Sequence, residues 1–217
     1  MSTTGLMTAG AWLALAVAFV GMALDLGAVI RGREAQRRFT KPIGLLAISA
    51  AAVFVHPAFA AQRSWFVAAF ILSLAGDVFL LKASRFVPGL IAFLLSHLCF
   101  IVGFFERGLN PSWAMLGALA LSISLVPVAP KLLSAIHEGS EPALLVPVVV
   151  YMTVISAMAI AAAGAGPWVA LAGAWIFMAS DSTLAWNRFV QASRSREIAV
   201  MVTYYLAQIL LLLGLSA

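Results

Sequence analysis

Three aspartates lie inside long apolar stretches of the sequence, where charged side chains are least expected. They are Asp25, Asp77 and Asp181, whereas the other five of the eight acidic residues lie in or beside polar links. An aspartate at the centre of a membrane helix costs roughly 2.5–3.5 kcal/mol on insertion scales, so each of the three aspartates is a candidate functional residue. The structural alternative is an interhelical hydrogen bond or a buried pair with a basic residue.

The three aspartates share one depth. Each is followed five to seven residues later by a basic residue, in turn Arg31, Lys82 and Arg188. At about 1.5 Å per helical residue, this places the carboxylates roughly 8–11 Å from one membrane boundary. The shared depth would allow them to converge on a single cavity. Two carboxylates in one cavity can divide the work of general acid and general base.

Other polar residues fall near the same layer and are candidates for substrate binding. Tyr204 and Gln208 are four apart and share a helix face. The full set of substrate-binding candidates is Lys41, Asp25, His97, Asn187, Arg188, Tyr204 and Gln208. Cys99 is the single cysteine, and the sequence shows no cluster of histidine and cysteine typical of zinc, so no metal is expected.

The composition predicts the elements that carry these residues. The 217 residues are 64% hydrophobic and 10% charged, whereas soluble domains carry about 25% charged residues. Continuous apolar stretches of about 17–24 residues suit helices that cross a hydrocarbon core of roughly 30 Å. We therefore expect an all-α polytopic protein, a single integral membrane domain over residues 1–217. The expected spans, about eight, are 7–30, 42–61, 65–81, 86–105, 112–129, 143–163, 167–187 and 198–215.

The net charge of +5 reflects topology. Eleven lysines and arginines lie in the first, third, fifth and seventh links, whereas the other side holds only Arg63 and Arg107. The positive-inside bias predicts a multi-pass protein of the cell inner membrane with both termini outside the cytoplasm. The aspartate layer then lies near the cytoplasmic leaflet. Because juxtamembrane charge explains the excess, no nucleic-acid partner is expected; the first link could also contact anionic lipid headgroups.

A short internal repeat links two of the aspartates. The third span contains Ala75-Gly76-Asp77-x-x-Leu80, and the seventh contains Ala179-Ser180-Asp181-x-x-Leu184. Both motifs are followed by Arg-Phe. An offset of four spans preserves orientation, which is typical of parallel repeats, so a four-helix repeat is predicted.

These motifs and their order resemble the YhhN-like lysoplasmalogenase family. The resemblance rests on Ser73–Leu81, on Phe93-Leu-Leu-Ser-His97 and on Ser180-Asp-Ser-x-Leu-Ala-Trp-Asn-Arg-Phe189. It also includes Thr203-Tyr-Tyr-x-Ala-Gln208 and Lys41-Pro42 at the start of the second span. It covers essentially the whole chain.

The resemblance implies hydrolysis of the vinyl ether bond of a lysoplasmalogen in the membrane. The products would be a fatty aldehyde and glycerophosphoethanolamine or glycerophosphocholine. Protonating the β-carbon of a vinyl ether gives an oxocarbenium ion that water captures, a reaction that suits one protonated and one ionised carboxyl group. Asp77 and Asp181 are the candidate pair, and no cofactor is required. Lys41, Arg188 or another basic residue near the inner surface would hold the phosphate.

Two readings from other classes remain open at this stage. Intramembrane acids and internal repeats also mark the paths of small transporters. A non-catalytic lipid-binding scaffold is the third reading. Release of aldehyde by purified protein without a gradient would separate the enzyme from the transporter.

Overall fold

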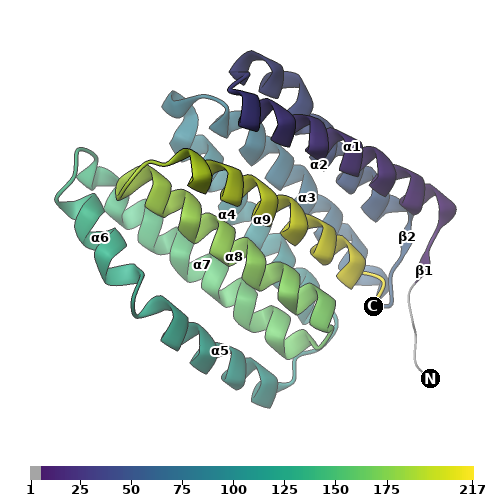
Figure 1. Ribbon diagram of the computed structural model, residues 1–217. Helices are drawn as coiled ribbons and strands as arrows, with labels where there is room; N and C mark the ends of the chain where they lie inside the picture. The colour runs from purple at the N-terminus through teal and green to yellow at the C-terminus, as the bar shows by residue number, and fades with distance from the viewer. Residues whose placement is uncertain (1–5) are drawn as a thin grey trace.

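The computed structural model describes residues 6–217, which form a bundle of helices (Figure 1). The long helices are α1 (Ala9–Arg31), α2 (Glu34–Phe54), α3 (Ala60–Leu80), α4 (Phe86–Phe105), α7 (Leu145–Ala165), α8 (Trp168–Phe189) and α9 (Arg194–Gly214). The shorter elements are α5 (Pro111–Leu125), α6 (Ala129–His137) and the 3₁₀ turns η1 (Ala83–Arg85) and η2 (Pro142–Leu144). Two short strands, β1 (Leu6–Met7) and β2 (Val55–His56), pair antiparallel at one end of the bundle.

The expected all-α polytopic architecture is confirmed. Within the described part of the chain, six helices are long and apolar enough to cross a membrane, and the bent pair α5–α6 brings the number to seven. Each of the eight expected spans overlaps a helix or this pair. The remaining helix, α2, is the most charged, because Arg37, Arg38 and Lys41 lie in its first half.

The second helix begins earlier in the structure than the sequence predicts. It was expected to start at Pro42, but α2 starts at Glu34 and contains Pro42 in its interior. The charged residues before Pro42 continue the helix because some of them have partners inside the protein. Arg37 and Lys41 are both buried. Lys41 therefore lies within α2 instead of opening it.

The fifth expected span, 112–129, is also corrected. The structure divides this region between α5 and α6, which meet at an angle of 53°. Pro127 and Pro130 lie at the break, where proline removes backbone donors and interrupts a helix. The expected link around Lys131 is therefore helical and belongs to α6.

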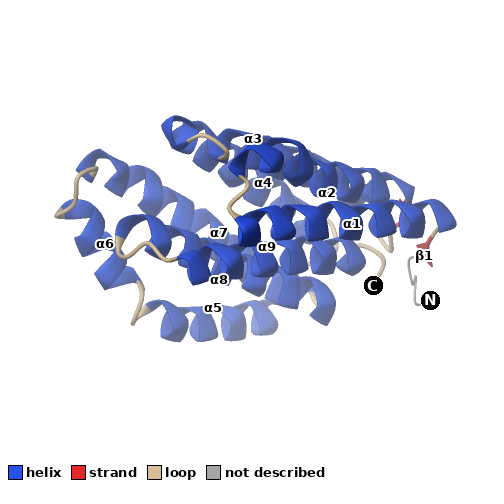
Figure 2. Ribbon diagram, turned by 45° about the horizontal axis from the view of Figure 1, so that its top comes forward, coloured by secondary structure: helices blue, strands red, loops and turns tan. Residues whose placement is uncertain are grey.

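Consecutive helices pack against each other as hairpins, namely α1 with α2, α3 with α4 and α8 with α9 (Figures 1 and 2). Small residues permit close contact, as is common between membrane helices. A Cβ atom on Gly173 of α8 would lie 2.9 Å from the backbone nitrogen of Leu211 in α9. Helix α4 also packs on α7, and so connects the first half of the chain to the second.

Both ends of the described chain lie at the same end of the bundle. Strand β1 pairs with β2, which follows α2, and the Ala58 amide donates to the Leu215 carbonyl oxygen at 3.4 Å. The Arg107 guanidinium donates to the backbone oxygen of Ala217 at 3.0 and 3.1 Å.

Candidate active site

Asp77 lies near the end of α3 and is held by two donors from other helices. Its Oδ1 is 2.8 Å from Nζ of Lys41 in α2. The hydroxyl of Tyr204 in α9 donates to Oδ2 at 3.0 Å. All three side chains are buried. Asp77 is thus one member of a buried ion pair, and its other oxygen also has a hydrogen-bond partner.

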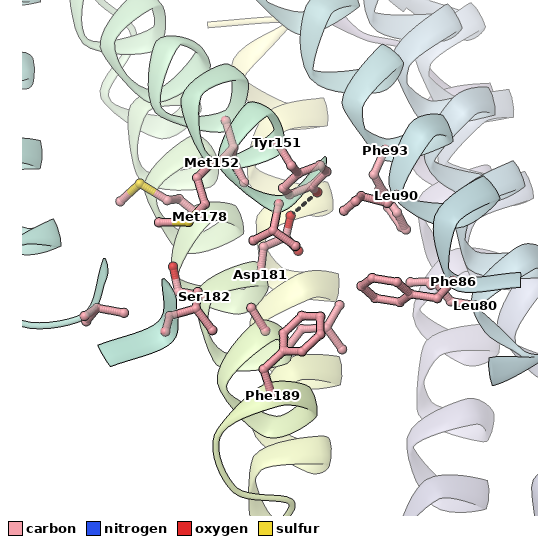
Figure 3. A pocket seen from close by; sticks show the side chains of 16 residues that line it. Leu80, Phe86, Leu90, Phe93, Tyr151, Met152, Met178, Asp181, Ser182 and Phe189 are labelled. Carbon is pink, nitrogen blue, oxygen red and sulfur yellow. Dashed lines mark hydrogen bonds between the residues drawn. The ribbon is translucent and has the colours of Figure 1, made fainter. Parts of the chain in front are cut away.

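Asp181 in α8 has a different set of partners (Figure 3). The hydroxyl of Tyr151 in α7 donates a short hydrogen bond to Oδ2. Nε2 of His97 in α4 is 2.8 Å from that hydroxyl and 3.4 Å from the same carboxylate oxygen. His97 is fully buried, and its Nδ1 has no hydrogen-bond partner within residues 6–217. Asp181 is therefore held by a phenol and an imidazole, without a lysine or arginine beside it.

The two aspartates line one polar cavity of about 270 Å³. Asp77 and Asp181 face it together with Lys41, Asn187 and Tyr204. Arg37 and Glu197 also line it and pair with each other at 3.0 Å. The two basic side chains of this cavity, Arg37 and Lys41, are thus already paired with Glu197 and Asp77. Asp181 is the carboxyl group of the cavity that has no lysine or arginine partner.

An apolar cavity of about 60 Å³ adjoins the polar one. Figure 3 shows the side chains that line the apolar cavity. The two share four lining residues: Leu80, Phe93, Asp181 and Leu184. The walls of the apolar cavity come mainly from α4, α7 and α8, and Leu132 of α6 closes one side. Asp181 lies at the junction, whereas Asp77 lines only the polar cavity.

The third intramembrane aspartate does not line either cavity. Asp25 is fully buried, and its Oδ2 accepts a hydrogen bond from the Tyr205 hydroxyl at 2.7 Å. Its Oδ1 accepts from the Thr40 hydroxyl at 3.1 Å and lies 3.6 Å from Nε of Arg37. These contacts connect α1 to α2 and α9. Asp25 therefore makes the interhelical hydrogen bonds and the buried ion pair that were the structural alternative to a functional role.

The other expected binding residues divide between the cavity and its surroundings. Asn187 and Tyr204 line the polar cavity, and His97 contacts Asp181 from outside it. Gln208 is fully buried, one turn beyond Tyr204, and lines neither cavity. Arg188 lies further out, where it pairs with Glu141 at 2.8 Å and stacks over the Phe86 ring at 3.9 Å.

A third hollow lies at this outer end, with a volume of about 290 Å³. Lys82, Asn187 and Arg188 contribute its polar lining, and Phe86 and Leu184 connect it to the apolar cavity. Arg188 is seven residues after Asp181, which is nearly two full turns and about 10 Å along α8. The basic residues therefore lie on the side of the apolar cavity that is nearest the C-terminal end of α8.

Two contributors were not expected from the sequence. Tyr151 carries no charge and lies in an apolar span, so nothing in the local sequence distinguishes it from an interfacial or packing tyrosine. Arg37 was assigned to the topology signal because it lies in a cluster of basic residues. Its burial in α2 could have been inferred only from the helix continuing before Pro42.

The partners of the two aspartates come from corresponding helices. Asp77 takes one partner from the preceding helix, α2, and one from α9, whereas Asp181 takes one from the preceding helix, α7, and one from α4. If α5 and α6 count as one span, these helices are related by an offset of four spans. The arrangement agrees with the predicted parallel repeat. Within residues 6–217, no cluster of His, Cys, Asp and Glu could hold a metal ion.

The sequence of this chain is similar to known proteins of one family. Human lysoplasmalogenase TMEM86B is 34% identical over 149 residues, which is 67% of this chain and 61% of the human protein. Lysoplasmalogenase of Mycobacterium tuberculosis (strain CDC 1551 / Oshkosh) is 33% identical over 224 aligned positions, 97% of this chain and 83% of its own length. No solved structure matches this one significantly. The model of the YhhN family matches residues 36–215, and the chain therefore belongs to the YhhN family.

Proposed function

We propose that this protein is a lysoplasmalogenase, a membrane hydrolase that cleaves the vinyl ether bond of lysoplasmalogens. One observation carries the proposal: in a YhhN-family chain, Asp77 and Asp181 line a polar cavity that continues into an apolar one. A lysoplasmalogen has the same division, with an apolar alkenyl chain joined through the reactive bond to a polar glycerophosphate. The relatives named lysoplasmalogenase support the assignment.

The reaction needs one protonated and one ionised carboxyl group. The protonated carboxyl gives its proton to the β-carbon, and the electrons of the double bond form the new C–H bond. Water then attacks the oxocarbenium carbon, and its proton passes to the ionised carboxylate. That proton is transferred to the glycerol oxygen as the C–O bond breaks, and the hemiacetal hydroxyl returns a proton to the first carboxyl. The products are a fatty aldehyde and a glycerophospho-base, and no cofactor takes part.

The apolar cavity accepts the alkenyl chain next to the reactive bond, and the phosphate lies toward the membrane boundary. Lys82, Asn187 and Arg188 offer donors there. Arg188 would exchange the Glu141 carboxylate, whose two oxygens both accept from Nη2, for the phosphate, which a guanidinium group also binds. Lys41 was expected to bind the phosphate, but its bond to Asp77 supports a role beside the carboxylate instead.

The charge distribution supports an orientation in the membrane. In this proposal the cytoplasmic side holds eleven of the thirteen lysines and arginines, which lie in links or in the helices beside them, as the positive-inside bias requires. The chain forms a single integral domain of the inner membrane with both termini outside. The active site then opens toward the cytoplasmic leaflet, where its substrate would enter from the lipid.

Aldehyde release by the purified protein in detergent tests the function. The substrate is a 1-alkenyl lysophospholipid, and the matched control substrate is its 1-acyl analogue, which lacks the vinyl ether. We expect aldehyde from the first and no product from the second, with or without a metal chelator. A transporter or lipid scaffold would release no aldehyde from either, and that outcome would overturn the proposal.

A further inference from the structure

We infer that Asp181 is the acid that protonates the substrate and that Tyr151 and His97 are positioning residues for its carboxyl group. Asp77 is then the carboxylate that receives the proton of the attacking water. The inference rests on the proposed function and goes beyond it, because the reaction alone does not say which aspartate plays which part. Three observations support the assignment.

The first observation is the position of each carboxyl group relative to the cavities. The carbon that accepts the proton is the second carbon of the alkenyl chain, so its donor must lie along the apolar cavity. Asp181 lines that cavity and Asp77 does not. Water attacks the neighbouring carbon, which bears the oxygen, and the polar cavity that both aspartates line is the place from which water can come.

The second observation is charge. The ammonium of Lys41 lies 2.8 Å from Asp77, so a negative charge on that carboxyl group has an opposite charge beside it. Asp181 has no lysine or arginine partner in the described chain, and its neighbours are a phenol and an imidazole. Two nearby carboxyl groups in unequal surroundings are the arrangement that divides an acid from a base.

The third observation is the direction of the hydrogen bonds. Tyr151 has one hydroxyl proton and donates it to Oδ2 of Asp181, so its oxygen accepts from Nε2–H of His97. Nδ1 of His97 is buried and has no hydrogen-bond partner among residues 6–217. Both described contacts of the Asp181 carboxyl go to Oδ2, so Oδ1 remains for the transferable proton.

The proton balance closes with these roles. Asp181 loses its Oδ1 proton to the β-carbon, and Asp77 takes one from the attacking water. Asp77 then gives that proton to the glycerol oxygen, and Asp181 regains one from the hemiacetal hydroxyl. The other titratable and charged groups that face this cavity are Arg37, Lys41, Glu197 and Tyr204, and none of them needs to change its proton content.

Chemical rescue tests which aspartate is the acid. Asp181→Ala and Asp77→Ala each remove one carboxyl group and leave room for a small acid. Added formate supplies formic acid, which can replace a general acid, and formate ion, which can replace a base. The rescue of Asp181→Ala per unit of total formate should therefore follow the formic acid fraction and fall about tenfold when the pH is raised by one unit, whereas the rescue of Asp77→Ala should follow the formate ion. The opposite pattern would reverse the assignment while leaving the lysoplasmalogenase function intact.

A pair of tyrosine variants tests the positioning role. Tyr151→Phe removes the hydroxyl that holds Asp181, and Tyr205→Phe removes a comparable buried hydroxyl that holds Asp25 instead. We expect Tyr151→Phe to lower kcat at least about tenfold with KM within about threefold, the pattern of an interaction used in the transition state. Tyr205→Phe should stay within about threefold in both.

A double-mutant cycle separates positioning from a general effect on the fold. His97→Gln keeps an N–H donor for Tyr151, whereas His97→Ala does not, so the first should retain more of the native kcat. In the Tyr151→Phe background, His97→Ala should have little further effect, because the chain of hydrogen bonds is already cut. Additive losses, or equal losses in Tyr151→Phe and Tyr205→Phe, would contradict the positioning role.

Discussion

The surroundings of Asp77 and Asp181 are built on corresponding helices but differ in charge. Asp77 meets Lys41 and Tyr204, whereas Asp181 meets Tyr151 and His97. Each carboxylate therefore has one phenol, and the second partner is an ammonium in one case and an imidazole ring in the other. The comparison shows one short motif in two different electrostatic surroundings, which is what the proposed division into acid and base requires. Both aspartates line the same polar cavity.

The largest expected effect comes from removing either carboxyl group. Asp77→Asn and Asp181→Asn keep the shape of the side chain but can neither supply nor take the proton. General acid–base catalysis contributes typically about 10²–10⁴-fold, so each variant should release aldehyde at least about a hundredfold more slowly. The double variant should be little worse than either single one, because the two act as a unit. Near-native turnover in either well-folded variant would contradict the two-aspartate account.

The next effect tests the ion pair that distinguishes the two sites. Lys41→Met keeps the length of the side chain but removes the charge that favours ionised Asp77. We expect kcat to fall about ten- to hundredfold while KM changes less, because the lost group acts on the base and not on the phosphate. Lys131→Met, at an exposed position of α6, is the control. A larger change in KM than in kcat would indicate instead that Lys41 binds the substrate phosphate.

A smaller effect compares the residues that precede the two aspartates in the repeat. A Cβ atom on Gly76 would lie 2.5 Å from the ring of Phe93, which lines both cavities. Overpacking of this kind lowers folding stability by about 1–3 kcal/mol and displaces neighbouring side chains. Because the displaced Phe93 ring lines both cavities, Gly76→Ala should also lower kcat/KM, by about tenfold. Ser180 also lines the polar cavity, but its hydroxyl donates away to the Val200 carbonyl oxygen at 3.0 Å, so Ser180→Ala should stay within about threefold. Steady-state kinetics of the two variants would show whether the glycine position is the sensitive one.

The smallest effect on the reaction is expected at Asp25. Its carboxylate holds Arg37, Thr40 and Tyr205 and lines neither cavity. Asp25→Asn should therefore slow aldehyde release less than about tenfold, although loss of a buried charge partner lowers the thermal stability in detergent. A loss of activity as large as that of Asp77→Asn, without a drop in thermal stability, would indicate that the active site uses three carboxylates.

The sequence predicts the helical membrane fold because apolar length is a direct requirement of the bilayer. It also singles out Asp77 and Asp181, since a carboxylate in a span is costly and both lie in matching motifs. Their shared depth follows from residue counting alone. The convergence of these two and not of Asp25 depends on how each helix is rotated about its axis, which residue counting does not contain.

The remaining differences have local causes. The start of α2 was missed because buried partners allow Arg37 and Lys41 to continue a helix that hydropathy places later. Helix α6 was missed because Pro127 and Pro130 end one apolar run and its own sequence is amphipathic. Tyr151 gave no signal because its role depends wholly on α4 and α8, which are distant in sequence.

The most direct test of the central claim is the configuration of the aldehyde formed in heavy water. If a carboxyl group held in this cavity protonates the β-carbon, the aldehyde carries one deuterium beside its carbonyl group, added from a single face. Reduction of the aldehyde as it forms prevents exchange, and the configuration of the labelled alcohol can then be measured by NMR with a chiral reagent. The native protein should give one configuration, and the residual product of Asp181→Asn should be a mixture. An equal mixture from the native protein would show that the proton comes from free solvent, and would contradict the account.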